Sequence, residues 1–402
     1  MQAYLPKSMG DGRQAASWTA AIVLISFPTV GMLSKHGMSS LGFAMAFLLC
    51  SLVLWNKRLP WPGLPLVLPA IFMLALQALN LLEVPSCSIP TEHWCQIAAS
   101  FVLLLPLSAG EMMMTTTGID RNLVRRALVN GVMIGAIVAI VELVFDSPIH
   151  RLFEGNDSNE IISLSRYNRG IVDLLLLAIV AAGILWIELR RLMAIGLLAM
   201  IALISMLGIS LTVHLCLLLG LITLFGSILA DKLVRTVLVV LVAVQMLTAP
   251  WAANAVYDWV LLDNIHIKDM AIRHRLELWD HGAALALQRP WTGWGIDAFY
   301  RQPIDPVRLA KAELMTKTEP HPHNAGLQLW IETGGVGVLL GIAFLVAANC
   351  SIGQLPIRVR PWATSLLAIG LLPGMVSFGI WQATYLAMTS VASFSLGLLD
   401  DQ

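Results

Sequence analysis

The sequence predicts an all-α polytopic membrane protein, and three features support this fold class. Of its 402 residues, 57% are hydrophobic and only 12% are charged, about half the charged fraction of a typical soluble domain. The mean hydropathy is +0.77. Apolar runs of roughly 17–25 residues recur from end to end, and a helix of that length crosses a bilayer core about 30 Å thick.

We predict about twelve membrane-spanning helices, which together form a single integral membrane domain of residues 1–402. Each predicted span is one apolar run. In chain order these runs lie near residues 17–34, 39–56, 64–82, 96–117, 127–146, 170–189, 192–209, 211–230, 234–250, 325–350, 362–378 and 380–398. No small-residue cleavage pattern follows the first run, so we expect no removable signal peptide.

Lysine and arginine in the short loops predict the orientation. On one side the loops carry Lys57, Arg58, Arg121, Arg125, Arg126, Arg190, Arg191, Lys232, Arg235, Arg358 and Arg360. The short loops on the other side carry only Lys35. The positive-inside rule makes the first side cytoplasmic. Because the number of spans is even, the N- and C-termini are both expected in the cytoplasm.

Two longer segments lie on the predicted outer side, residues 147–169 and the large loop 251–324 between the ninth and tenth spans. Both carry basic residues against the prevailing bias, arginines in the first segment and arginines and lysines in the second. This favours an anionic ligand at the outer face; ordinary ion pairs with nearby acids are the alternative. The chain as a whole is neutral, with 25 basic and 25 acidic residues, which argues against a nucleic-acid partner. Cys87 and Cys95 share another outer loop, where a disulfide and two free thiols both remain open.

The large loop is predicted to contain an amphipathic helix over about residues 264–288, where apolar and charged residues alternate at helical intervals. Arg275 and Trp279 are four residues apart and share one face of this helix, so the indole can support or stack on the guanidinium. The sequence RPWTGWG follows, and Pro290 is expected to end the helix.

The segment HPHN, residues 321–324, lies where the large loop meets the next apolar run. Pro320 and Pro322 exclude a helix up to this point, so His323 and Asn324 are expected at the N-terminus of the tenth span. The positive end of the helix dipole disfavours a protonated histidine there and favours an anion. A neutral imidazole would then be available as a base, although a histidine at a membrane interface is often only a polar residue at a convenient depth.

Inside the tenth span, Glu332 and three glycines stand out. A carboxylate about eight residues into a membrane helix is costly and tends to have a functional or structural partner. Gly334, Gly335 and Gly337 would let another helix or a lipid-linked substrate approach closely.

These motifs resemble a known family. In order they are YNRG, RLELW, RPWTGWG and HPHNAGLQLWIETGGVG, and with the predicted spans and the large late loop they are similar to the O-antigen ligase superfamily. This superfamily of bacterial membrane glycosyltransferases also includes O-antigen polymerases and protein O-oligosaccharyltransferases. The resemblance implies a GT-C-like enzyme of the inner membrane. It would move a glycan from undecaprenyl diphosphate, a carrier anchored in the membrane lipid, to an acceptor hydroxyl at the periplasmic face. For a ligase the acceptor is the lipid A–core oligosaccharide.

The resemblance also implies roles for particular residues. The family's essential histidine corresponds to His323, and its essential arginines correspond most naturally to Arg169 in YNRG and Arg275 in RLELW, with Arg166 and Arg273 close enough to be confused with them. Supporting roles stay open for His321, Asn324, Trp279 and Glu332. No cofactor, metal or nucleotide sugar is expected.

The chemistry suits these residue types. A sugar hydroxyl is a poor nucleophile at neutral pH, and a histidine can take its proton in the transition state. The diphosphate leaving group needs charge stabilisation, which arginine supplies with a fixed, always-charged fork. We therefore expect a single displacement with inversion at the anomeric carbon, in which His323 is the base and Arg169 and Arg275 bind the diphosphate.

Several alternatives remain at the level of sequence. Asp173 lies four residues after Arg169 and could simply pair with it. A polymerase or a protein oligosaccharyltransferase would use a different acceptor. Outside enzymes, a twelve-helix solute transporter would use Glu142, Asp173 and Glu332 as coupling sites, but the histidines and arginines lie at the predicted outer face instead of the midplane.

Overall fold

The computed structural model describes residues 7–56, 64–82, 94–104, 119–154, 164–262, 269–312 and 319–399, and every regular element in these ranges is a helix. The all-α prediction is therefore confirmed for this part of the chain. The main helices are α1 (Lys7–Leu33), α2 (Lys35–Asn56), α3 (Leu64–Leu82), α5 (Arg121–Val144), α6 (Pro148–Glu154), α7 (Asn168–Ile187), α8 (Arg191–Leu207), α9 (Leu211–Leu262), α10 (Met270–Gln288), α11 (Ala298–Arg301), α12 (Pro306–Lys311), α13 (Ala325–Gln354), α14 (Arg360–Val376) and α15 (Ala383–Leu396). Two short 3₁₀ helices, η3 (Leu164–Tyr167) and η4 (Gly397–Leu399), precede α7 and follow α15.

Five of the described helices are long and apolar enough to cross a membrane. These are Gln14–Leu33, Arg121–Val144, Asn168–Ile187, Leu211–Val260 and Ala325–Gln354. Shorter apolar helices include Trp94–Leu104, Arg191–Leu207 and Ala383–Leu399. The count of twelve spans stays a prediction, since part of the predicted fourth span, residues 105–118, lies outside the described residues.

Helix α9 contains two of the predicted spans, 211–230 and 234–250. Ala230 has non-helical angles, φ −148° and ψ 61°. A Cβ atom on Gly226 would lie 3.1 Å from a methyl group of Val234, whereas eight residues of straight helix would separate them by about 12 Å. The chain therefore folds back at Ala230, where the sequence predicts a short loop.

The helix that contains the ninth predicted span is longer than expected. We expected the helix to end near residue 250, but α9 continues to Leu262 with Pro250 inside it. Proline has no N–H, so it leaves the carbonyl four residues earlier without its helical donor. Here that carbonyl belongs to Met246, and the indole Nε1 of Trp330 donates to it at 2.8 Å. A side chain from α13 therefore supplies the missing hydrogen bond and allows the helix to continue.

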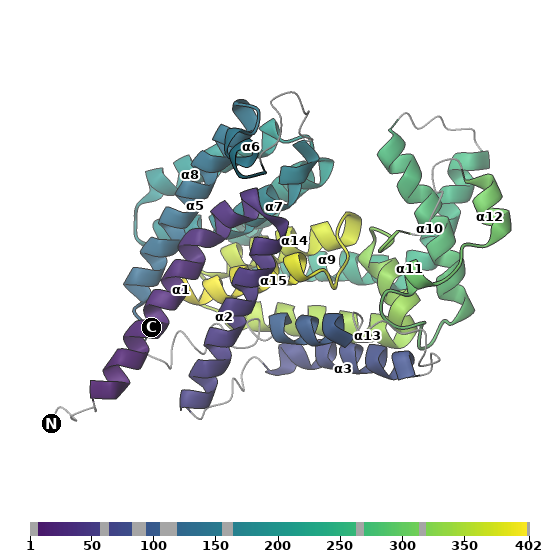
Figure 1. Ribbon diagram of the computed structural model, residues 1–402, viewed down its shortest axis with the longest axis horizontal. Coiled ribbons are helices and arrows are strands. Elements are labelled where there is room, and N and C mark those ends of the chain that lie inside the picture. Colours follow the sequence, from purple (N-terminus) through teal and green to yellow (C-terminus); the bar gives the residue numbers. More distant parts are fainter. Residues whose placement is uncertain are drawn as a thin grey trace.

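Helix α7 is the centre of the bundle and carries Arg169 near its first residue. It is apolar on all sides, which is the pattern of a fully surrounded helix, and every residue from Gly170 to Leu185 is buried. Helices α1, α5, α8, α14 and α15 all pack against it. Figure 1 shows α3 and α13 side by side along one edge of the molecule and α10, α11 and α12 grouped at one end.

The predicted amphipathic helix is present as α10, whose N-cap Asp269 accepts hydrogen bonds from Ala271 N and Ile272 N. It packs against α9 and α13. Residues 263–268 and 313–318 of the predicted 251–324 loop lie outside the described residues. The loop's position outside the membrane stays a prediction.

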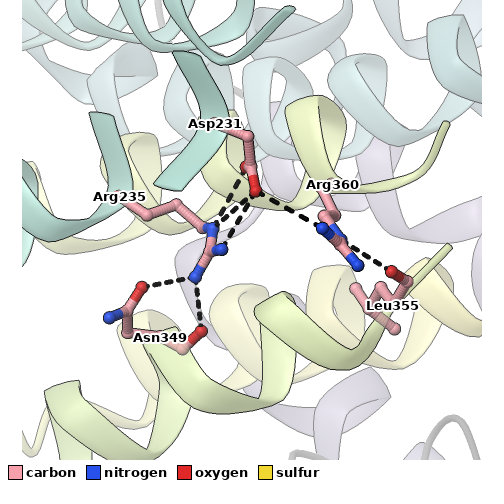
Figure 2. Close-up of polar contacts among 5 residues, drawn as sticks. All are labelled: Asp231, Arg235, Asn349, Leu355 and Arg360. Atoms are coloured by element: carbon pink, nitrogen blue, oxygen red, sulfur yellow. Dashed lines mark hydrogen bonds and ion pairs between the residues drawn. The ribbon is translucent and has the colours of Figure 1, made fainter. Parts of the chain in front are cut away.

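Far from the histidines, at the other end of α13, a charged cluster ties three helices together (Figure 2). Arg235 in α9 binds Asp231 through its Nε and Nη2 atoms at 2.9–3.2 Å and donates from Nη1 to the backbone and side-chain oxygens of Asn349 in α13. Arg360, at the start of α14, lies 3.9 Å from Asp231 and donates to the Leu355 carbonyl. Arg235 and Arg360, both predicted to be cytoplasmic, therefore take part in polar contacts that join α9, α13 and α14.

Asp231→Ala should destabilise the protein by about 3 kcal/mol, because it leaves the guanidinium of Arg235, whose side chain is only 8% exposed, without its counter-charge. Thermal unfolding in detergent measures the effect. Lys232→Ala is the matched control, since it removes an exposed charge at the next residue. Equal melting temperatures for the two variants would contradict a stabilising role for the cluster.

Candidate functional site

The HPHN segment forms a tight turn into the N-terminus of α13. Asn324 is the N-cap: its Oδ1 accepts from Leu327 N at 3.0 Å and from Gln245 Nε2 in α9 at 3.0 Å. This confirms the predicted start of the helix. His323 adopts a left-handed conformation with φ +54°, and Trp279 Nε1 of α10 donates to the Pro322 carbonyl at 2.9 Å.

The two histidines of this turn lie against each other. Their ring centroids are 4.4 Å apart, with the planes at 86°. His323 Nδ1 binds the carbonyl of Ser377, and His321 Nε2 is 2.7 Å from Gln382 Nε2. Ser377 and Gln382 belong to the connection between α14 and α15, so this connection holds both rings.

Both histidines are uncharged at neutral pH. Burial lowers the pKa of His321 to about 3, and its neighbours His323 and Arg169 lower this pKa further. Burial also lowers the pKa of His323 below its ordinary value; Arg275 and His274 add to this shift, while the Ser377 carbonyl and Glu319 oppose it. A neutral imidazole can accept a proton, as the sequence predicts for His323.

A cavity of about 490 Å³ joins these histidines to the arginines at the start of α7. Segments far apart in the sequence line it: the α1–α2 junction, α6, the beginning of α7, the HPHN turn and the residues after α14. Its ionisable side chains are His36, His150, Arg166, Arg169, His321 and His323. The cavity is therefore polar and rich in cationic and imidazole groups, as an anion site requires.

Arg169 has no ion-pair partner in the part of the chain that the structure describes. Its guanidinium lies 5.9 Å from the ring centroid of Phe378. The predicted alternative, a salt bridge to Asp173, is not formed: both carboxylate oxygens of Asp173 are buried without a hydrogen-bond partner among the described residues. A Cβ on Gly31 would lie only 2.8 Å from that carboxylate, so Asp173 faces α1.

Other basic residues of the predicted outer segments are paired with nearby acids or carbonyl groups, which was the alternative to an anionic ligand. Arg151 binds Asp146 at 2.7 Å, Arg308 pairs with Asp280, and Arg301 donates to backbone carbonyls of Trp294 and Ile296. These arginines are already occupied, and a free anion would have to compete for them.

Not all predicted site residues meet in the cavity. Arg166, Arg169, His321 and His323 line it, whereas Arg273, Arg275, Trp279, Asn324 and Glu332 do not. Arg275 is still close enough for its charge to lower the pKa of His323. The indole N–H of Trp279 binds the HPHN turn, and no cation–π contact joins its ring to Arg275 within the described residues.

Glu332 has partners on three sides. Its carboxylate is fully buried and accepts from Trp381 Nε1 at 2.7 Å, Gln328 Nε2 at 3.0 Å and Gln77 Nε2 at 3.2 Å. Gln328 also accepts from Ile380 N at 3.1 Å. The buried acid therefore fixes the α14–α15 connection, which in turn binds the two histidines.

Next to Glu332, the RPWTGWG loop inserts into a break in α13. The break is at Gly334, which has φ +62° and ψ −165°. Trp294 N and Gly295 N donate to the carbonyls of residues 331 and 332 at 2.8 and 2.9 Å, and Gly335 N donates to the Pro290 carbonyl at 2.7 Å. The glycines were predicted to let another helix or a lipid-linked substrate approach closely. In the structure, the protein's own RPWTGWG loop makes this close approach.

The sequence interpretation missed several cavity residues. His36 and His150 were not singled out, although the predicted topology places both on the outer side with His323. Ser377 and Phe378 also line the cavity, and Gln382 contacts His321. All three fall inside the predicted spans 362–378 and 380–398 and gave no signal of their own.

Glu142 explains how His150 and Arg169 are brought together. Its carboxylate accepts from Ile149 N at 2.7 Å and from the hydroxyl of Tyr167 at 2.6 Å. The end of α5 therefore holds α6 next to the residues that lead into α7.

Comparison with known proteins identifies part of the chain. No curated protein matches the sequence. The protein family described as O-antigen ligase matches residues 197–342, about a third of the chain. The matched stretch includes α9, α10, the RPWTGWG loop, the HPHN turn and Glu332, though not Arg169. This part of the chain is therefore similar to the O-antigen ligase family, whose members are glycosyltransferase-like ligases, and the membrane-length apolar helices suit a membrane protein.

Proposed function

We propose that the protein is an O-antigen ligase of the bacterial inner membrane, with both termini in the cytoplasm. It would transfer a glycan from undecaprenyl diphosphate to a hydroxyl of the lipid A–core oligosaccharide at the periplasmic face. The observation that carries the proposal is the polar cavity of about 490 Å³ in which His323 and Arg169, from segments about 150 residues apart, face the same space.

His323 is suited to be the base. The Ser377 carbonyl can only accept, so the proton of the neutral ring lies on Nδ1 and Nε2 keeps its lone pair. In a single displacement the acceptor oxygen forms a bond to the anomeric carbon while Nε2 takes the hydroxyl proton. The bond from the anomeric carbon to the diphosphate breaks, and its electron pair leaves with the phosphate oxygen.

Arg169 and Arg275 are the proposed ligands of the diphosphate. Arg169 lines the cavity and is unpaired within the described residues, so its donors are available for phosphate oxygens. Arg275 lies outside the lining but acts on His323 electrostatically. Preorganised positive charge stabilises the negative charge that develops on the leaving group.

A second cavity fits an aliphatic chain and supports a lipid-linked donor. It has a volume of about 580 Å³ and lies among α9, α13, α14 and α15, lined mainly by apolar side chains. Met375, Ile380 and Trp381 line it, while Ser377 and Phe378 line the polar cavity. A lipid-linked donor could therefore place its diphosphate in the polar cavity and its hydrocarbon tail in the apolar cavity, on opposite sides of residues 375–381.

A lipopolysaccharide gel from cells lacking this protein tests the function. For a ligase, the deletion leaves bare lipid A–core and accumulated undecaprenyl-linked glycan, and the wild-type gene restores the high-molecular-weight ladder. Core that carries a single repeat unit would identify a polymerase. An unchanged ladder would contradict the proposal and point to a protein oligosaccharyltransferase or a transporter.

Arg169→Ala should weaken binding of inorganic diphosphate to the purified protein by ~10- to 100-fold, the loss expected when hydrogen bonds to a charged group are removed. Isothermal titration calorimetry in detergent measures the affinity. Arg151→Ala is the control, because that guanidinium is already paired with Asp146. If both variants bind diphosphate like the wild type, Arg169 is not the phosphate ligand.

A further inference from the structure

Residues 377–382, the connection between α14 and α15, contact both histidines of the cavity. The Ser377 carbonyl accepts from His323 Nδ1, and Gln382 Nε2 lies 2.7 Å from His321 Nε2. Gly379 lies against the same edge of the His321 ring, because a Cβ at that position would be 2.6 Å from His321 Cδ2. One short segment therefore sets the orientation of both rings.

The donor and acceptor chemistry of these contacts assigns one tautomer to each ring. An amide nitrogen can only donate, so the Gln382 N–H points at a bare Nε2 of His321 and the proton of that ring lies on Nδ1. The carbonyl of Ser377 imposes the same Nδ1–H tautomer on His323. His321 is 7% exposed, and burial keeps it neutral.

We propose that Gln382 is a positioning residue for the transfer reaction: it holds His321 as the Nδ1–H tautomer and edge-on to His323, and so keeps the base aligned with its substrate. The inference rests on the proposed function, in which His323 is the base. With ring centroids 4.4 Å apart, a positive charge on His321 would oppose the positive charge that His323 must acquire in the transition state.

The buried acid Glu332 supports the same arrangement. It binds Trp381, the neighbour of Gln382, through the indole N–H at 2.7 Å, and Gln328 binds the backbone N–H of Ile380 at 3.1 Å. Both hydrogen bonds come from the second and third turns of α13, which begins directly after the HPHN turn. The start of α13 therefore holds residues 377–382 in place, and these residues in turn align His321 and His323.

Two variants separate alignment from packing. Gln382→Glu keeps the size of the side chain but replaces the donor with an acceptor, so His321 must turn its proton to Nε2 or become charged. Gln382→Leu removes the hydrogen bond altogether. We expect both to lower kcat for glycan transfer by ~10- to 100-fold, with KM for the acceptor and affinity for inorganic diphosphate unchanged. Gln302→Leu, a half-buried glutamine outside the cavity, is the control.

Nitrogen-15 NMR of labelled histidines reads the tautomers directly, with His321→Gln used to assign the signal. The wild type should show a protonated Nδ1 and a bare Nε2 at His321, and Gln382→Glu should show a protonated Nε2. Wild-type turnover in Gln382→Glu, or an unchanged His321 signal in that variant, would overturn the inference and leave Gln382 a packing residue. If the wild type transfers no glycan, the proposed function fails on its own, while the NMR result still decides whether Gln382 sets the tautomer.

Discussion

His323→Ala should lower the rate of glycan transfer by about 10²- to 10⁴-fold, the usual contribution of a positioned general base. The imidazole is held between the Ser377 carbonyl and the ring of His321, and its lowered pKa keeps it unprotonated at neutral pH. A methyl group in its place leaves no group that can take the proton of the acceptor hydroxyl. Transfer in vitro from an undecaprenyl-diphosphate-linked glycan to lipid A–core measures the loss.

The loss should lie in the chemical step. His323 is half-buried at the cavity wall and its backbone leads into the α13 cap, so the variant should still fold and bind inorganic diphosphate through Arg169. His214→Ala, which removes a histidine of α9 that does not line the cavity, should transfer glycan at the wild-type rate. Comparable activity of His323→Ala and His214→Ala would exclude His323 as the base.

Much of the local structure of this site could be predicted from the sequence. Pro320 and Pro322 exclude helix before residue 323, and Asn324 is a residue type that caps helices, so the position of His323 at a helix start follows from chemistry within a few residues. The helix α10 could likewise be predicted from the alternation of apolar and charged residues within its own segment. In both cases the residues that decide the structure are neighbours in the chain.

The contacts that assemble the site were beyond such reasoning because they join distant segments. Arg169 and His323 share a cavity only after α7 is buried at the centre of the bundle, and Gln382 becomes informative only when its amide is seen next to His321. The ninth predicted helix ended too early for the same reason: the hydrogen bond that lets α9 continue past Pro250 comes from Trp330, 80 residues later. Only the resemblance to a family brought Arg169 and His323 into one prediction.

Gly334→Ala should destabilise the fold by ~4 kcal/mol, because it adds backbone strain to a steric overlap. With φ +62° and ψ −165°, Gly334 occupies a backbone region that is essentially restricted to glycine. A Cβ there would also overlap the carbonyl group of Trp291 and lie 2.6 Å from Thr292 N. These are backbone atoms of the inserted loop, and they cannot move aside without breaking the hydrogen bonds that Gly335 N and Val336 N donate to the Pro290 and Trp291 carbonyls.

Gly335→Ala provides the matched control one residue away. Its Cβ would meet the Pro290 carbonyl oxygen at 3.4 Å and the Trp330 ring at 3.5 Å, which are ordinary contact distances. We therefore expect Gly335→Ala to melt near the wild type in detergent, and Gly334→Ala to give little folded protein and no transfer. The break in α13 lies two residues after Glu332, so its loss would also release the α14–α15 connection from the histidines. Equal stability and activity of Gly334→Ala and Gly335→Ala would contradict the claim that the inserted RPWTGWG loop requires the break of α13 at Gly334.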